Sequence, residues 1–251
     1  MLKRRIIPIE LLDGGRLIKT VGFSNPRDVG DPVKSSQVYS DQDADELVLL
    51  NISRIQRDIA VLNEVVLQIA CECFVPFTVG GGIACLDDAS QLFDAGADKV
   101  LVNSAVYSHP DLISEISTRY GQQAVVVGID ARLGATGFEL FSDCGRRYES
   151  ASLAEHIIMA VEAGAGEIMI QSIERDGTML GYDLNLIKSV VALSPLPLIV
   201  AGGAGDFTHL KQAFDLGADA AACGSLFNFG DNNPLRAKAF LKNYNIPLKR
   251  I

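Results

Sequence analysis

Glycine and small polar residues recur in two matched sets along the chain. Gly82 and Gly203 are 121 positions apart, and Ser104 and Ser225 are separated by the same interval. A glycine lets a phosphate group approach the backbone closely, and amides at the start of a following helix donate hydrogen bonds to it. We interpret the sets as two phosphate cradles for a ligand with a phosphate at each end; the alternative is that the glycines only permit tight turns. The first set is Gly82, Asn103 and Ser104, and the second is Gly203, Gly224 and Ser225.

The elements that must position these sets are short apolar runs that alternate with longer helical patterns, such as Asp87–Ala95 and Thr208–Leu216. Continuously apolar runs are typical of parallel strands that are covered on both faces. Eight such runs favour an α/β fold of one (β/α)8 TIM barrel, and an open doubly wound sheet is the alternative. The predicted strands are Arg5–Leu11, Glu46–Ile52, Phe77–Val79, Lys99–Val102, Ala124–Ile129, Glu167–Ser172, Leu198–Ala201 and Ala220–Cys223.

The common interval also predicts how the chain is organised. Gly96 and Gly217, and Glu46 and Glu167, repeat the spacing of 121 residues. We therefore expect a single barrel over residues 1–251, made of two similar half-barrels at about 1–122 and 123–251. A repeat of this length does not indicate a solenoid.

Composition limits the partners. The net charge of −9 argues against nucleic acid and anionic membranes, and no apolar run reaches the ~18 residues of a membrane span. An anionic small substrate remains compatible, because backbone amides bind phosphate without a basic surface. Five cysteines without framework spacing indicate a reducing, cytoplasmic setting. The three scattered histidines suggest no metal site.

Six segments of the chain carry specific motifs: FTVGGGI (77–83), GADKV (96–100), QAVVVGIDAR (123–132), SIERDGT (172–178), GYD (181–183) and AGGAG (201–205). Together they strongly resemble the cyclase subunit of imidazole glycerol phosphate synthase, and the resemblance covers essentially the whole chain. It implies a heterodimer in which ammonia from a glutaminase subunit travels through the barrel and reacts at its mouth, with no cofactor. The substrate is a ribulose that carries an imidazole carboxamide ribotide. The products are imidazole glycerol phosphate and an aminoimidazole carboxamide ribotide.

The resemblance also assigns residues at the mouth. Lys19 matches a family lysine after the first strand, and Asp130 matches one of two acid–base carboxylates. Asp130 ends the run AVVVGI and should point into the mouth, although a turn cap is the alternative. One phosphate would be held by Gly82, Asn103 and Ser104, and the other by Asp176, Gly177, Gly203, Gly224 and Ser225.

The second family carboxylate is absent, because Leu11 stands where the family has Asp. Leu11 cannot transfer a proton, and the neighbouring Glu10 would face the other side of a strand. Loss of one acid–base group removes about 10²–10⁴ of rate from its step. We therefore expect an inefficient imidazole cyclase. Three further positions also depart from the family, with Ile9 for Cys, Asn51 for Asp and Gln171 for Thr.

The opposite end of the barrel matches the family fully. In the family, a ring of charged residues at this end gates the entry of ammonia. The ring corresponds to four residues of this chain, each at the start of an apolar run. The alternative is that these four are ordinary charged residues exposed to solvent. Asp98 and Gln123 match family positions that contact the glutaminase. The four gate residues are Arg5, Glu46, Lys99 and Glu167.

A matching entrance and an altered mouth favour a lyase-type synthase subunit that is fed ammonia by a glutaminase but uses another phosphorylated or sugar-derived acceptor. Such paralogues resemble proteins of surface-polysaccharide (lipopolysaccharide) clusters, where they accompany sugar amidation. One alternative is the genuine cyclase of histidine biosynthesis. Another is a non-catalytic scaffold that conducts ammonia, and a phosphoribosyl isomerase is a more distant alternative.

Overall fold

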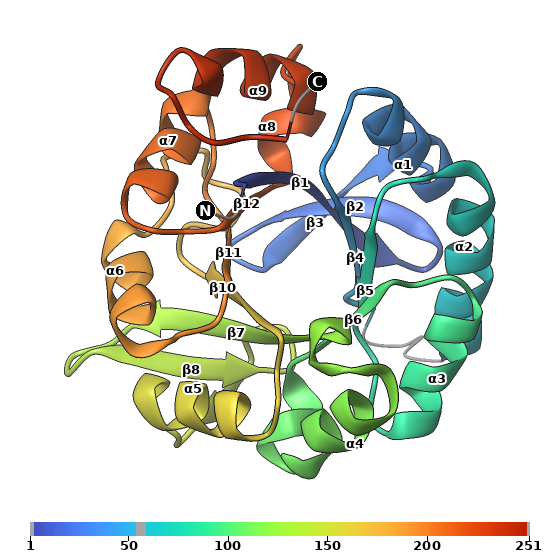
Figure 1. The fold of residues 1–251 in the computed structure, drawn as a ribbon, viewed down its shortest axis with the longest axis vertical. Coiled ribbons are helices and arrows are strands. Elements are labelled where there is room, and N and C mark those ends of the chain that lie inside the picture. The colour runs from blue at the N-terminus through green and yellow to red at the C-terminus, as the bar shows by residue number, and fades with distance from the viewer. Residues whose placement is uncertain (1–2, 54–58, 250–251) are drawn as a thin grey trace.

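Eight parallel strands close into a barrel with helices around it, in a computed structural model that describes residues 3–53 and 59–249. Figure 1 looks along the barrel, with the strands in the centre and the helices outside them. The barrel order is β1, β4, β5, β6, β7, β10, β11 and β12, and β12 pairs back onto β1. The predicted (β/α)8 fold is therefore confirmed, and the open sheet is excluded.

The elements follow one another in strict alternation, interrupted by two antiparallel additions. None of the helices in the described ranges is long and apolar enough to cross a membrane. In chain order the elements are β1 (Arg5–Asp13), β2 (Arg16–Val21), β3 (Ser24–Gly30), α1 (Pro32–Asp41), β4 (Leu47–Asn51), α2 (Ile59–Glu72), β5 (Phe77–Gly80), α3 (Leu86–Asp94), β6 (Lys99–Val102), η1 (Ser104–Tyr107), α4 (Asp111–Tyr120), η2 (Gln122–Ala124), β7 (Val125–Leu133), β8 (Phe138–Ser142), β9 (Arg147–Glu149), α5 (Leu153–Glu162), β10 (Glu167–Ser172), α6 (Leu184–Leu193), β11 (Leu198–Ala201), α7 (Phe207–Asp215), β12 (Ala220–Cys223), α8 (Ser225–Asn228) and α9 (Pro234–Lys242).

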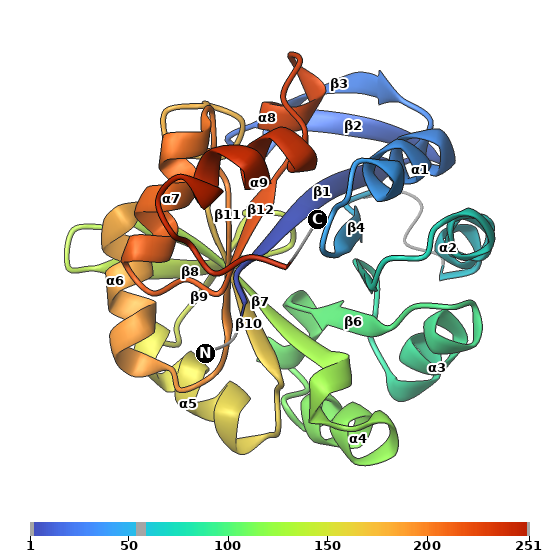
Figure 2. The same cartoon turned by 45° about the horizontal axis from the view of Figure 1, so that its top comes forward.

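The first antiparallel addition follows β1, in residues 14–32. Most of this segment is the β2–β3 hairpin, which Figure 2 shows beside α1 and α8. Gly14 and Gly15 form the two-residue turn from β1 into β2, with φ of 57° and 77°. A turn with two positive φ values favours glycine, so the sequence Asp-Gly-Gly was a hairpin signal.

The second addition extends β7. The expected strand ended at Ile129, but β7 continues to Leu133 because β8 pairs with it, with Asp130 opposite Phe141. Asp130 therefore lies inside a strand, and its alternative as a turn cap is excluded.

Alternation along β1 separates two apolar cores. Ile7, Ile9 and Leu11 belong to the cluster inside the barrel, whereas Ile6 and Leu12 pack in the cluster between strands and helices. Successive strand residues point to opposite faces. Leu11 therefore faces the barrel interior, where the family carboxylate was expected.

Corresponding elements of the two halves have equal spacing. The elements β5, α3, β6 and η1 begin and end 121 positions before β11, α7, β12 and α8. These equal offsets support the interpretation of two half-barrels, which we keep as a proposal.

Candidate functional site

Four charged side chains close the N-terminal end of the barrel. Arg5 contacts Glu46 at 2.7 Å and Glu167 at 3.1 Å, and Lys99 contacts the same two carboxylates at 3.1 and 2.6 Å. Thr78 also donates to Glu46 at 2.6 Å. Although burial opposes its charge, the bonds and charges of Arg5 and Lys99 lower the pKa of Glu167. The four predicted gate residues thus form an alternating ring, and their gating role remains a prediction.

Asp98 and Gln123, the predicted partner-interface residues, are both exposed near this end. Asp98 accepts a hydrogen bond from the Phe77 amide at 2.8 Å, so its carboxylate also fixes the start of β5. Gln123 donates to the Tyr120 carbonyl at 3.0 Å. Their side chains are accessible to a partner, and contact with a glutaminase stays a prediction.

At the C-terminal end, Asp130 projects from β7 into the mouth. Asn103 donates a hydrogen bond to its carboxylate at 2.9 Å. Burial raises the pKa of Asp130 to about 7, and the nearby charge of Asp176 adds to the rise, although the Asn103 bond favours the ionised form. A carboxyl with a pKa near neutrality can both accept and donate protons at physiological pH. This is the property that acid–base chemistry requires.

Among the described residues, those of β1 that line the mouth cavity carry no carboxyl group. Leu11 and Ile9 line the cavity at this end and are 8% and 7% exposed. Glu10 lies on the opposite face of β1, as the alternation predicts, and accepts a hydrogen bond from Ser36 of α1 at 2.6 Å. Within the described residues, the two β1 side chains that line this cavity are therefore both hydrocarbon.

The second phosphate set gathers around the same cavity, which Gly203, Gly224 and Ser225 line. A Cβ on Gly203 would lie 2.3 Å from the Gly181 carbonyl oxygen, so its φ of 114° and the space both demand glycine. Lys19 also lines the cavity, and its Nζ would lie 2.8 Å from a Cβ on Gly224. The structure thus places a cation beside the second predicted cradle.

Asp176 fastens the hairpin to the barrel. Its carboxylate accepts hydrogen bonds from Thr20 at 2.7 Å, from the Phe23 amide at 3.2 Å and from Gln171 at 3.1 Å. Gly177 has a φ of 69°, and a Cβ there would lie 2.0 Å from the Thr20 carbonyl oxygen. Because carboxylate oxygens repel phosphate, any phosphate contact at these two residues would come from backbone amides.

The first phosphate set lies at the ends of β5 and β6. Gly82 has a φ of 86°, and the Ser104 hydroxyl accepts a hydrogen bond from the Asp143 amide at 3.0 Å. Asn103 precedes η1 with φ −136° and ψ −83°, and Gly224 precedes α8 with φ −104° and ψ −81°. The two sets therefore share a backbone geometry, while phosphate binding at both stays a prediction.

Sequence reasoning missed Thr20, which is 6% exposed and joins the hairpin to Asp176. The available signal was the Gly14–Gly15 pair, which is typical of a hairpin turn, followed by residues with strand propensity in Arg16–Val21. The bond to Asp176 crosses 156 positions, and local patterns carry no information on such a pairing.

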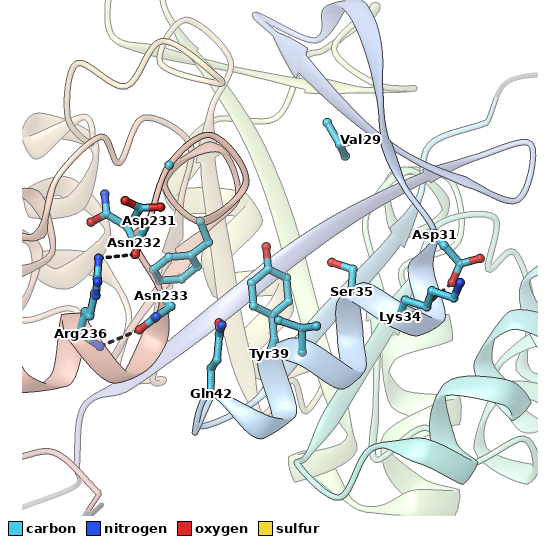
Figure 3. A pocket seen from close by; sticks show the side chains of 13 residues that line it. Val29, Asp31, Lys34, Ser35, Tyr39, Gln42, Asp231, Asn232, Asn233 and Arg236 are labelled. Atoms are coloured by element: carbon cyan, nitrogen blue, oxygen red, sulfur yellow. Dashed lines mark hydrogen bonds between the residues drawn. The ribbon is translucent and has the colours of Figure 1, made fainter.

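Other polar features lie outside the mouth. A groove of about 750 Å³ lies between α1 and the segment around α8 and α9, and Figure 3 shows Tyr39 and Gln42 across it from Asn233 and Arg236. His209 caps α7 by accepting from the Gly205 amide at 3.1 Å, and His156 stacks on Tyr107. Across the described ranges, no group of three His, Cys, Asp or Glu side chains is arranged to hold a metal ion.

Known proteins resemble the chain along its length. A family model described as "Histidine biosynthesis protein" matches residues 5–233. The imidazole glycerol phosphate synthase subunit HisF of Streptomyces coelicolor is 41% identical over 246 residues, with 98% of each chain covered. The proteins of the same name are 42% identical in Acidobacterium capsulatum (99% of each chain covered) and 43% identical in Exiguobacterium sibiricum (96% of this chain and 97% of the relative).

Proposed function

Because the chain belongs to the histidine biosynthesis protein family, and within it to the HisF subunits of imidazole glycerol phosphate synthase, we propose that it is the synthase subunit of a glutamine amidotransferase complex. A glutaminase partner delivers ammonia at the N-terminal end, and the mouth adds it to a phosphorylated small molecule. One observation carries the proposal. The charged ring and Asp130 lie at opposite ends of an apolar barrel interior, which suits a small neutral reactant.

The first candidate reaction is the one that names the relatives, the synthesis of imidazole glycerol phosphate in histidine biosynthesis. Identity above 40% over nearly the whole chain supports it. On this proposal, Asp130 and Lys19 take part in the chemistry at the mouth, and the two sets of glycine and serine bind the two phosphates. The comparisons favour this reaction over a reaction of ammonia with another acceptor.

A second candidate rests on Leu11. The chain is then a paralogue that uses ammonia on another phosphorylated or sugar-derived acceptor, as in amidation of a surface sugar. Leu11 faces the mouth and Glu10 points away, so on this proposal Asp130 acts without a carboxylate at position 11. An apolar wall at this position suits an acceptor that needs no proton transfer from strand one.

Steady-state kinetics with ammonium salts and the biphosphorylated ribotide tests both candidates. A turnover number of about 1–10³ s⁻¹ is ordinary for enzymes and supports the imidazole reaction. Turnover that appears only after Leu11→Asp supports the second candidate. The synthase proposal itself fails if the purified complex with a glutaminase transfers no nitrogen from glutamine to any phosphorylated carbonyl acceptor.

A further inference from the structure

The turn between β8 and β9, residues 143–146, has an unusual backbone. Asp143, Cys144 and Gly145 follow one another with φ of 51°, 54° and 77°. Residues other than glycine seldom adopt a positive φ, and such conformations persist only where the surrounding structure holds them. Because strained segments concentrate at functional sites, the contacts of this β8–β9 turn are informative.

Neighbouring segments at the mouth hold the β8–β9 turn in place. The Cys144 Sγ lies 3.8 Å from the carbonyl oxygen of Ile52, which follows β4. A Cβ on Gly145 would lie 2.9 Å from the ring of Phe23, at the tip of the β2–β3 hairpin, and 3.4 Å from Ile173. Since Ile173 directly follows β10, the turn packs between the first hairpin and the C-terminal ends of barrel strands.

The first residue of the turn contacts the first phosphate set directly. The backbone N–H of Asp143 donates a hydrogen bond to the hydroxyl oxygen of Ser104 at 3.0 Å. A hydroxyl group has one hydrogen to donate and accepts hydrogen bonds at its oxygen. Because the amide hydrogen already occupies one side of this oxygen, the hydroxyl hydrogen of Ser104 must point elsewhere. A hydroxyl that accepts a hydrogen bond is also polarised into a stronger donor.

The two hairpins at the mouth contact the two phosphate sets crosswise. The β8–β9 hairpin follows β7 in the second half of the chain and contacts Ser104 in the first half. The β2–β3 hairpin follows β1 in the first half, and its Lys19 stands beside Gly224 in the second half. Its Thr20 also donates to Asp176 of the second half. Each half of the chain therefore contributes a hairpin to the phosphate set of the other half.

We propose that Asp143 is a positioning residue whose backbone amide orients the Ser104 hydroxyl, so that this hydroxyl donates its hydrogen to the phosphate of a ligand in the first set. The inference rests on the proposed function for one point, that the substrate is phosphorylated. The role belongs to the backbone of the β8–β9 turn and acts entirely through Ser104.

The test compares two variants of the full chain, Asp143→Val and Asp143→Gly. Both remove the carboxylate, so every contact of that side chain is lost in both. Glycine adopts the left-handed conformation freely, whereas a β-branched valine rarely does, so only Asp143→Val moves the amide away from Ser104. Each variant is titrated with inorganic phosphate, and the backbone amide NMR signals of Ser104 and Ser225 report binding at the first and at the second set separately.

We expect the first set of Asp143→Val to bind phosphate about fivefold more weakly than that of Asp143→Gly, as the loss of one hydrogen bond predicts, and the second set to show no difference. The difference should disappear when both variants also carry Ser104→Ala, because no hydroxyl is then left to orient. A merely structural role of the turn would leave the difference in the Ser104→Ala background.

The inference is overturned if Asp143→Val and Asp143→Gly bind phosphate equally at Ser104, if their difference persists with Ser104→Ala, or if phosphate does not bind at Ser104 in the wild type. If Asp143→Val does not fold, hydrogen exchange of the Asp143 amide decides. Bound phosphate must slow this exchange in the wild type and not in Ser104→Ala, and an unchanged rate in the wild type overturns the inference. None of these measurements uses ammonia or a glutaminase, so the failure of this inference and that of the proposed function are distinguishable.

Discussion

The charged groups at the two ends of the barrel have opposite kinds of partners. At the N-terminal ring, Arg5 and Lys99 each contact both Glu46 and Glu167, so every charge has two partners of opposite sign. At the mouth, the described residues give Asp130 an amide partner and a carboxylate neighbour, but no cation contact. The pKa of Glu167 is lowered, whereas that of Asp130 is raised to about 7.

This difference separates structural from chemical use of the same residue types. Paired charges hold fixed protonation states and geometry, which suits a closed entrance. A carboxyl that burial leaves near neutrality can change its protonation state during a reaction, and such perturbed groups concentrate at functional sites.

The largest expected effect follows Asp130→Asn. An amide cannot accept or donate the proton, so ammonia-dependent turnover of the complex should fall by about 10²–10⁴. Steady-state kinetics with glutamine and with ammonium salts measure it, and glutaminase binding by calorimetry serves as the control. Unchanged turnover with intact binding would favour the alternative of a non-catalytic scaffold.

Asp130→Asn should also change the pH dependence of stability. The folded-state pKa of Asp130 lies above its unfolded value of 3.8, so burial costs stability once the carboxyl must ionise. As the pH rises from about 4 to about 7, the ionisation of this group should lower the free energy of unfolding of the wild type by no more than about 4 kcal/mol. Urea unfolding at a series of pH values should show that the variant lacks this decline. Parallel curves for the two proteins would mean that burial does not perturb Asp130.

We expect the substitution Arg5→Met in the ring to lower the free energy of unfolding. The variant leaves Glu46 and Glu167 facing each other with Lys99 as their remaining contact in the ring, and breaking a buried ion pair costs about 3–5 kcal/mol. Arg16→Met is the matched control, because the Arg16–Asp28 pair is exposed and should matter little. Urea unfolding at pH 7 measures both variants. Equal losses in the two would show that the ring is no stronger than a surface pair.

Sequence patterns predicted the barrel well because each barrel strand has its own apolar run in the local sequence. Lys99–Val102 and Glu167–Ser172 have the expected bounds, since a continuous apolar run and its charged first residue coincide with the strand. The four ring residues also come together as expected. The β2–β3 hairpin was missed, because its second strand, Ser24–Gly30, is mostly exposed and carries no apolar pattern. The bonds of Asp176 to Thr20 and Phe23 depend on tertiary proximity, which no local pattern encodes.

We expect the smallest effect from Thr20→Val, which tests the bond between the hairpin and Asp176. Valine keeps the shape but removes the donor to Asp176, and loss of a buried hydrogen bond to a charged group costs about 1–3 kcal/mol. The amides of Gly22 and Phe23, which donate to the Asp176 carbonyl and carboxylate, should then exchange their hydrogens faster than those of β12. Because Thr20 favours the ionised form of Asp176, the raised pKa of Asp176 should rise further. Hydrogen exchange that accelerates equally in β12 would contradict a local role, since it would report global destabilisation rather than release of the hairpin from the mouth.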